Sequence, residues 1–217
     1  MGNCYKILYK GGEGELIEKK SRFIATTMPV ETEEEALAFI ETMRKKYWDA
    51  SHNCYAYTVG MRQEICRASD DGEPSQTAGK PMMDVLLGEE LHNICVVVTR
   101  YFGGTLLGTG GLVRAYSGAA KEGIEQSVIV EKHLGRKITL VTDYNGIGKI
   151  QYLIAKEEIL TLHTEYAENV TVEILVLEEE TEHVKKMITE ATNGRCQITL
   201  GDEIWFGEAL GETVLFE

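Results

Sequence analysis

The sequence has no apolar run long enough to cross a membrane. A membrane-spanning helix needs about 20 apolar residues, whereas the longest dense apolar run, Ile94 to Val98, has the length of a strand. The N-terminal segment, Met1 to Lys20, mixes glycine, glutamate and lysine without an apolar centre, which argues against a signal peptide. We therefore predict a soluble, cytoplasmic protein with no membrane partner.

The sequence also lacks cysteine pairs of the CxxC type. Its five cysteines are scattered, and an odd number without a regular framework argues against a secreted disulfide scaffold and against a structural zinc site. We expect reduced, mostly buried thiols, and we predict neither a metal nor a cofactor. The cysteines are Cys4, Cys54, Cys66, Cys95 and Cys196.

Positive charge is scarce. The 217 residues include 22 Lys and Arg against 35 Asp and Glu, a net charge of −13, which excludes a uniformly basic surface for nucleic acid. We expect no DNA partner. Residues 1–133 hold 15 basic and 19 acidic residues (−4), and residues 134–217 hold 7 and 16 (−9). Charge thus disfavours nucleic-acid binding by the second part and leaves it open for the first.

The start of the chain has the patterns of strands and one helix. Alternating apolar residues from Tyr5 to Tyr9 and a glycine-rich turn predict a hairpin whose second strand runs from Leu16 to Thr27. Thr32 and Glu35 have the spacing of a capping box, and apolar residues then recur at helical intervals as far as Tyr47. We expect a helix there.

The following segments complete the first part. Asn53 to Val59 and Glu64 to Ala68 have the pattern of two strands. Thr77 is a candidate cap for a second helix, which Gly88 would end. Ile94 to Tyr101 is apolar and rich in β-branched residues, which predicts a strand buried on both faces. A glycine-rich turn then leads into a third helix.

A domain boundary is expected in the charged stretch from Glu131 to Lys137. The patterns beyond it follow the order β-α-β-β-α-β, which is typical of a ferredoxin-like domain. We therefore predict an α+β protein with domains at 1–133 and 134–217. The expected strands of the second domain are 137–143, 160–166, 170–176 and 196–200, and its helices lie around 147–154 and 184–191.

The window from Leu91 to Lys121 contains no acidic residue and includes Arg100 and Arg114. A strand there leads through the glycines of Gly103 to Gly111 into a helix. Glycines let backbone N–H groups approach a ligand, and a helix N-terminus carries partial positive charge, so the arrangement suits an anion. A glycine-rich connection that only lets the helix pack closely on a sheet explains the same residues equally well.

The glycine-rich turn does not match a nucleotide-binding motif. Gly103 and Gly108 have the glycine spacing of a P-loop, but Thr109 stands where that motif needs lysine. Gly108 to Val113 does not give GxGxxG either, because Val113 occupies the last position. An NTPase is therefore a weak hypothesis.

A second dense stretch, Arg67 to Pro81, combines acidic, hydroxyl and basic residues. One interpretation is solvated turn chemistry in which Ser75 and Thr77 act as caps. In the other, Asp70, Asp71 and Glu73 hold Arg or Lys side chains in place or contact a ligand. The sequence leaves both open.

The case for catalysis is thin. His52, Cys54, Ser69 and Asp70 are residue types found in nucleophilic sites, but no GxSxG motif surrounds a serine. A single histidine beside a strand is more often a packed or hydrogen-bonding residue. We therefore predict no catalytic residue.

These stretches together resemble the YigZ/IMPACT family. The match is carried by the segments 52–57, 67–75 and 77–81, and above all by VTRYFGGTLLGTGGLVRAY at Val98 to Tyr116. So long a joint match is far more specific than either glycine motif. One departure is Gln76, which stands where the family usually has glycine. The two predicted domains are similar to those of the bacterial two-domain members.

The resemblance implies a fold and a setting. It implies an N-terminal domain like the second domain of ribosomal small-subunit protein five, and a C-terminal ferredoxin-like domain like late domains of elongation factor G. For the eukaryotic relatives it implies translational control, through binding of an activator of the amino-acid-starvation kinase. For bacterial members it implies an association with ribosomes or RNA.

Three hypotheses follow. The leading one is a non-catalytic regulatory protein associated with translation, whose N-terminal glycine-rich anion site binds RNA, the ribosome or a translation factor. The alternative is a small-molecule or nucleotide-binding enzyme that uses the same pocket for a phosphate-bearing ligand. The third is a protein-interaction module whose acidic second domain meets a basic partner. The candidate ligand-binding residues are His52, Arg67, Ser69, Asp70, Asp71, Glu73, Ser75, Thr77, Lys80, Arg100, Tyr101, Gly103, Gly104, Thr105, Gly108, Thr109, Gly110, Gly111 and Arg114.

Overall fold

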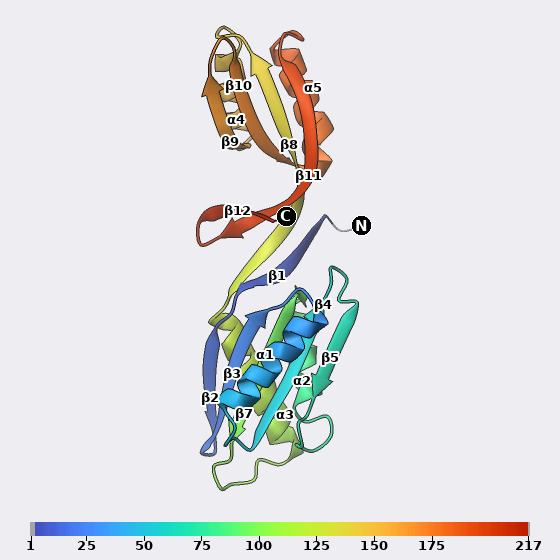
Figure 1. The fold of residues 1–217 in the computed structure, drawn as a ribbon, viewed down its shortest axis with the longest axis vertical. Coiled ribbons are helices and arrows are strands. Elements are labelled where there is room, and N and C mark those ends of the chain that lie inside the picture. The colour runs from blue at the N-terminus through green and yellow to red at the C-terminus, as the bar shows by residue number, and fades with distance from the viewer. Residues whose placement is uncertain (1–2, 217) are drawn as a thin grey trace. The chain divides into compact units, whose positions relative to one another are not determined.

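The computed structural model describes residues 3–216, which divide into two compact units (Figure 1). The first unit contains Tyr5–Glu131, to which Glu208–Glu212 return, and the second contains Lys132–Gly207 with residues from both chain ends. The predicted division into 1–133 and 134–217 places residues 208–212 in the second domain, whereas here they belong to the first unit. Mixed α+β structure is present in both units, as predicted.

The first unit is built on a five-stranded antiparallel sheet with β7 (Ile94–Tyr101) at its centre. Ile94, Val96 and Val98 pack in one core with residues of α2 and α3, whereas Cys95 and Val97 pack on the other face with α1. The prediction that this strand is buried on both faces is therefore confirmed. The strand order is β2 (Glu13–Glu18), β3 (Ser21–Pro29), β7, β4 (His52–Val59) and β5 (Ile65–Ser69), and the helices are α1 (Glu33–Lys46), α2 (Gly79–Gly88) and α3 (Thr109–Glu125).

The capping box predicted for α1 is present. The backbone N–H of Glu35 donates to the Thr32 hydroxyl at 3.2 Å, and the Glu35 carboxylate accepts from the N–H of Glu31 at 2.7 Å. The Glu35 carboxylate thus bonds to Glu31, the residue before the N-cap Thr32, and not to the N-cap itself. Together these bonds satisfy two N–H groups at a helix end that has no intrahelical partner for them.

The predicted N-terminal hairpin is wrong in its pairing. β1 (Cys4–Lys10) pairs in parallel with the short β6 (Leu91–His92), and the hairpin is formed by β2 and β3. Its two-residue turn consists of Lys19 and Lys20, with φ of 47° and 68°, which is the backbone that tight hairpins require. The upstream glycines instead allow close packing: a Cβ on Gly11 would lie 2.1 Å from the Thr27 carbonyl oxygen.

The second unit has the predicted β-α-β-β-α-β order. Its strands are antiparallel in the order β11-β8-β10-β9, and its core includes Ile138, Leu140, Ile150, Ile174 and Ile188. β8 begins well before the predicted strand, and a short 3-10 helix η1 (Glu178–Glu180) and a strand β12 (Glu212–Phe216) were not predicted. The main elements are β8 (Val128–Thr142), α4 (Ile147–Lys156), β9 (Leu160–Tyr166), β10 (Val170–Leu177), α5 (Thr181–Ala191) and β11 (Gln197–Ala209).

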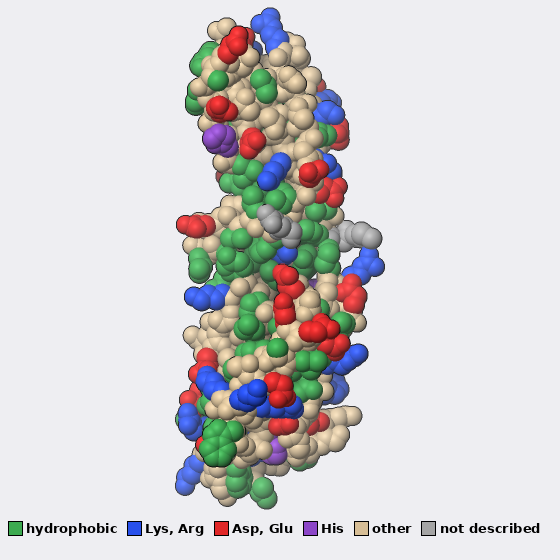
Figure 2. Space-filling view, viewed as in Figure 1, with side chains coloured by type: hydrophobic (Ala, Val, Ile, Leu, Met, Phe, Trp, Pro, Cys, Tyr) green, Lys and Arg blue, Asp and Glu red, His purple; other side chains and the backbone are tan. Residues whose placement is uncertain are grey.

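The surface carries both signs of charge. On the face of the first unit seen in Figure 2, lysines and arginines are interspersed with acidic side chains rather than gathered in one field. Within the part of the chain that the structure describes, no helix is both long and apolar enough to cross a membrane.

Candidate functional site

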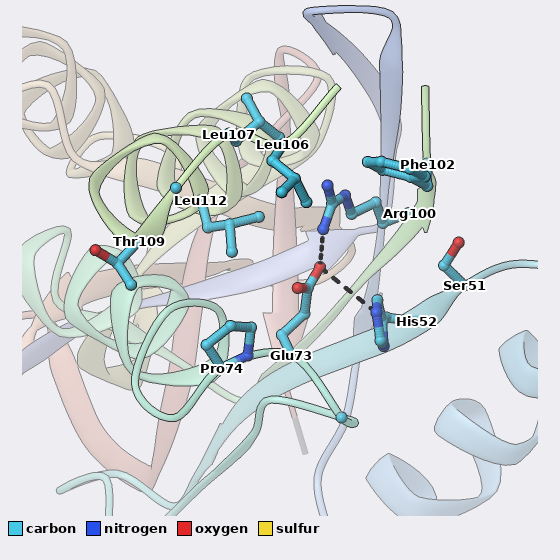
Figure 3. A pocket seen from close by; sticks show the side chains of 12 residues that line it. Ser51, His52, Glu73, Pro74, Arg100, Phe102, Leu106, Leu107, Thr109 and Leu112 are labelled. Atoms are coloured by element: carbon cyan, nitrogen blue, oxygen red, sulfur yellow. Dashed lines mark hydrogen bonds and ion pairs between the residues drawn. The ribbon is translucent and has the colours of Figure 1, made fainter. Parts of the chain in front are cut away.

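A pocket of about 560 Å³ lies in the first unit at the end of β7 (Figure 3). Its volume is in the range of small-molecule sites, which is roughly 300–1,000 Å³. The start of β4, the end of β7, the start of α3 and the loop between β5 and α2 all contribute to it. We call this loop, residues 70–78, the acidic loop. The apolar part of its lining consists of Pro74, Phe102, Leu106, Leu107 and Leu112.

The polar part of the pocket is a buried ion pair. The Arg100 Nη1 atom lies 2.5 Å from Oε1 of Glu73, and the two side chains are only 7% and 3% exposed. The hydroxyl of Tyr116 donates to the same carboxylate oxygen at 2.8 Å. Burial raises the pKa of Tyr116, so this hydroxyl keeps its proton and remains a donor.

His52 faces the same carboxylate. Its Nε2 atom lies 3.9 Å from Oε1 of Glu73, and its Nδ1 atom is 2.8 Å from the carbonyl oxygen of Asp71. Because a carbonyl oxygen can only accept, Nδ1 carries the hydrogen of this bond. This bond holds the ring with Nε2 toward the carboxylate of Glu73.

The guanidinium group of Arg100 is held between aromatic rings. Its Cζ atom lies 5.4 Å from the ring centre of Phe23 and 5.5 Å from that of Phe102, distances typical of cation–π contacts. Arg100 makes its hydrogen bond to Glu73 through Nη1. Its Nε atom is buried and has no hydrogen-bond partner among residues 3–216.

The glycine-rich turn serves packing and shapes the pocket. A Cβ on Gly103 would lie 2.1 Å from the backbone of Lys20, so this glycine allows close approach to the β2–β3 turn. Gly108, with φ of 73°, is the N-cap of α3, and no side chain caps this helix among the described residues. Backbone N–H groups of the first turn of α3 therefore remain available beside the pocket.

Asp70 caps α2 from a distance. Its carboxylate accepts hydrogen bonds from the backbone N–H groups of Gln76, Ala78 and Gly79 at 2.8–2.9 Å. Burial disfavours the charged form, but these bonds outweigh it and lower the pKa of Asp70. The prediction that Thr77 caps this helix is wrong, because the Thr77 hydroxyl instead donates to the carbonyl of Pro74 at 2.6 Å.

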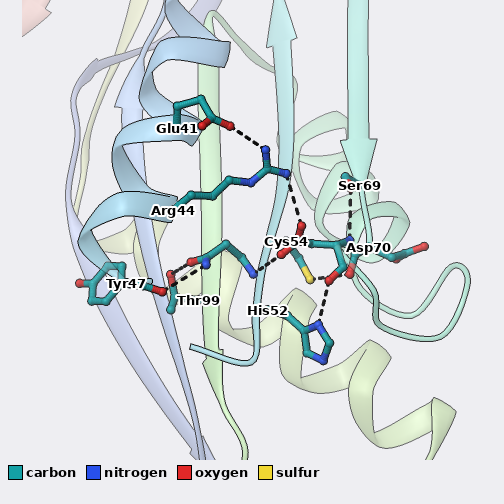
Figure 4. A network of polar contacts seen from close by, with 10 residues as sticks. Glu41, Arg44, Tyr47, His52, Cys54, Ser69, Asp70 and Thr99 are labelled. Carbon is teal, nitrogen blue, oxygen red and sulfur yellow. Dashed lines mark hydrogen bonds and ion pairs between the residues drawn. The ribbon is translucent and has the colours of Figure 1, made fainter. Parts of the chain in front are cut away.

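Asp71 fastens the acidic loop to β4 and α1. Figure 4 shows Arg44 of α1 in this network of polar contacts. One of its carboxylate oxygens accepts from the N–H of Asn53 at 2.7 Å, and the other lies 3.3 Å from Nη2 of Arg44. Asp71 and Glu73 thus hold arginines in place, as one interpretation of this loop proposed. Asp70 holds backbone N–H groups instead.

The predicted site residues fall into three groups. His52, Glu73, Arg100, Gly108 and Thr109 line the pocket. A separate cavity of about 420 Å³ includes Ser69, Asp70 and Lys80. The others line neither cavity: Arg67, Asp71, Ser75, Thr77, Tyr101, Gly103, Gly104, Thr105, Gly110, Gly111 and Arg114.

Several residues outside the pocket have partners elsewhere. Lys80 pairs with Asp84 on α2 at 2.9 Å, and the Tyr101 hydroxyl donates to Asp49 at 2.8 Å. Arg114 is exposed and its Nη1 atom reaches back toward the first turn of α3, 3.6 Å from where a Cβ on Gly110 would lie.

The sequence reasoning missed the apolar lining. Phe102 and Leu106 are 49% and 83% exposed and lie on the glycine-rich turn between β7 and α3. The sequence did contain one sign of this lining: large apolar residues stand in a glycine-rich turn, where exposure to solvent is expected. Tyr116 packs in the core of the first unit, and its hydroxyl also reaches Glu73.

The pocket has few groups suited to catalysis or metal binding. His52 and Glu73 are the only His, Cys, Asp or Glu among its lining residues, and Oε1 of Glu73 is already bonded to Arg100 and Tyr116. Cys54 lies under the loop, where its thiol donates to the carbonyl of Asp70 at 3.0 Å. Burial raises its pKa, so the thiol is not activated as a nucleophile.

The fold and the pocket define a two-unit α+β protein with a ligand-sized site in its first unit. Residues 19–124 match the family model described as the Impact N-terminal domain, and residues 140–195 match a domain of unknown function, DUF1949. The chain is 42% identical over 210 residues to IMPACT family member YvyE of Bacillus subtilis (strain 168), covering 97% of each protein. It belongs to the IMPACT family.

Two further comparisons agree. The chain is 39% identical over 150 residues to IMPACT family member YigZ of Escherichia coli (strain K12), covering 68% of this chain and 74% of YigZ. A crystal structure of a hypothetical protein is similar with a TM-score of 0.59 and 31% identity, covering 93% of this chain and 99% of that one. The predicted family and two-domain architecture are therefore confirmed.

Proposed function

We propose that this chain is a non-catalytic regulatory protein that acts in translation in the cytoplasm and binds a phosphate-bearing partner, RNA above all, through its first unit. Membership of the IMPACT family supports the setting, since translational control is the role that the resemblance implies for eukaryotic members. We also propose that the two units share the folds of the second domain of ribosomal small-subunit protein five and of late domains of elongation factor G.

The observation that carries the binding proposal is the start of α3. Among residues 3–216, no side chain caps this helix at Gly108, which lies beside a pocket that contains Arg100. Uncapped N–H groups at a helix N-terminus and a nearby guanidinium are the groups that hold phosphate oxygens. Arg114 supplies an exposed cation from the same helix, near its first turn.

The test is the salt dependence of RNA binding by the full chain. We expect the affinity for a short single-stranded RNA to fall steeply with salt. Arg114→Ala should flatten the plot of log affinity against log salt by about 0.7 if Arg114 contacts one phosphate. Lys45→Ala removes the same charge from α1, which covers the other face of the sheet, and should leave the slope unchanged.

Co-sedimentation with ribosomes tests the setting. We expect the full chain to sediment with ribosomes at low salt and Arg114→Ala to do so less. Binding of RNA that is independent of salt, or that Arg114→Ala leaves unchanged, would contradict the proposed site.

The alternative, a small-molecule or nucleotide-binding enzyme that uses the same pocket, is favoured by the volume of that pocket. The polar groups argue for binding over turnover, because Cys54 is not activated and Glu73 is engaged with Arg100 and Tyr116. A turnover assay with phosphorylated metabolites and nucleotides separates the two candidates.

A further inference from the structure

The Arg100 side chain has an unused hydrogen-bonding edge. A guanidinium offers five N–H donors, and the pair formed by Nε and one Nη suits two oxygens of a carboxylate or phosphate. Here the bond to Glu73 uses Nη1, which lies on the side away from the Nε hydrogen, so Nε and Nη2 form the free edge. Nε is the only buried side-chain nitrogen or oxygen without a partner among residues 3–216.

This free donor belongs to a side chain that is 93% buried and lines the pocket. A buried N–H without an acceptor destabilises the folded protein, so an acceptor supplied by a ligand would recover that free energy. Phe23 and Phe102 fix the guanidinium, which lowers the entropy lost when a ligand binds. The uncapped start of α3 favours a negatively charged acceptor in the same pocket.

The leucines that line the pocket favour an apolar group on the ligand. Leu107 and Leu112 line the pocket beside Leu106, whose side chain is 83% exposed (Figure 3). Contact with an apolar group would remove this exposed leucine side chain from water, which is energetically favourable. A bare inorganic anion would leave this apolar surface uncovered, whereas an apolar body attached to the anion would bury it.

We propose that the pocket binds a small amphipathic acid, whose carboxylate or phosphate monoester group bonds to the Nε–Nη2 edge of Arg100 while its apolar body packs against Leu106, Leu107 and Leu112. The proposal rests on the proposed function in treating the pocket as a binding site, and it names the ligand that would act there as an effector. Nε is buried in the unliganded chain, so the acid reaches it only if a neighbouring side chain moves aside.

The test is calorimetric titration of the full chain with four probes. Phenyl phosphate and phenylacetate carry the two oxyanions on the same ring, inorganic phosphate lacks the ring, and benzyl alcohol lacks the charge. We expect at least one aromatic acid to bind at least about tenfold more tightly than both inorganic phosphate and benzyl alcohol. The stronger of the two acids identifies the oxyanion.

Two variants locate the binding. Arg100→Lys keeps the charge and removes the planar edge, so we expect the tighter acid to lose about tenfold in affinity; circular dichroism checks that the variant is folded. Leu106→Ser changes an exposed residue, which leaves folding intact, and should weaken the aromatic acid about threefold without affecting inorganic phosphate. Leu37→Ser, at an exposed leucine on α1, is the matched control and should bind as the parent does.

Three results would overturn the proposal: no binding of either acid, equal binding of benzyl alcohol, or unchanged binding in both folded pocket variants. RNA binding measured on the same preparation separates this proposal from the proposed function. If RNA binds and the acids do not, the amphipathic-acid proposal alone fails. If the acids bind and RNA does not, the RNA part of the proposed function fails and the effector site stands.

Discussion

Arg100 and Glu73 form a buried ion pair although 27 residues separate them in the sequence. Arg100 comes from the end of the central strand β7, and Glu73 comes from the acidic loop between β5 and α2. The Tyr116 hydroxyl from α3 bonds to the same carboxylate. Three separate parts of the first unit therefore meet at one carboxylate oxygen.

Replacing Glu73 should destabilise the protein strongly. Glu73→Ala leaves the Arg100 charge buried without its partner, a change that typically costs about 3–5 kcal/mol. Urea unfolding followed by circular dichroism measures the free energy of unfolding. Glu34→Ala, at an exposed position on α1, is the control and should change it by less than about 0.5 kcal/mol. A cost below 1 kcal/mol for Glu73→Ala would show that Arg100 does not depend on this carboxylate.

Asp70→Asn should reduce stability in a way that depends on pH. The pKa of Asp70 is lowered in the folded protein, so its charged cap stabilises α2 fully above the ordinary pKa of 3.8 and is lost as pH falls through the lower folded value. We expect a deficit of about 1–2 kcal/mol near neutral pH. Below about pH 4 the parent should approach the variant in stability.

Thermal unfolding of both proteins between pH 7 and pH 3 measures this difference. Asp84→Asn removes an exposed carboxylate that pairs with Lys80 on α2, and it should cost about 0–1 kcal/mol. A deficit for Asp70→Asn that stays constant down to pH 3 would contradict a role for the charge of Asp70.

Gln76→Gly should stabilise the protein. Gln76 has φ of 63°, in the left-handed region that costs a residue with a Cβ about 1–2 kcal/mol. Glycine removes that cost but raises the entropy of the unfolded chain by about 0.4–1 kcal/mol, so we expect a net gain of about 0.5–1 kcal/mol. Differential scanning calorimetry measures it. Gln76→Ala retains the Cβ and should show no gain, so equal gains in both variants would refute this account.

Thiol labelling under native conditions should separate the cysteines. Burial raises the pKa of Cys54 and of Cys95, and both side chains are inaccessible, so neither should react with a thiol reagent at pH 8. Cys4 is exposed and should react first. Mass spectrometry of the labelled peptides identifies each site. Labelling of Cys54 at the rate of Cys4 would show that the acidic loop opens readily.

The elements that the sequence predicted well are those defined by local pattern. The capping box of α1 and the buried strand β7 follow from residues a few positions apart. The β-α-β-β-α-β order of the second unit follows in the same way from the alternation of short periodic segments. The N-terminal hairpin failed because no local pattern shows that β1 pairs with β6, about 85 residues away.

The candidate site was predictable only in part, for a related reason. The glycine-rich turn and Arg100 stood out in the sequence, but the partner of Arg100 lies in another segment. Asp70 caps a helix that begins nine residues later, beyond the three-residue spacing of ordinary caps, so Thr77 was the expected cap. Phe102 and Leu106 follow the central strand in the sequence, in the segment that turns toward α3. No local pattern shows that both line one pocket.

Three carboxylates of the acidic loop, within four positions, bond to five elements: Asp70 to the start of α2, Asp71 to β4 and α1, and Glu73 to β7 and α3. A neutral residue at any of these positions leaves an unmatched donor in a different element. During divergence, position 71 is therefore expected to change together with position 44, and position 73 together with position 100. The loop and its partner residues should therefore vary together among related proteins. A chimera that exchanges the loop without these partners should fold poorly.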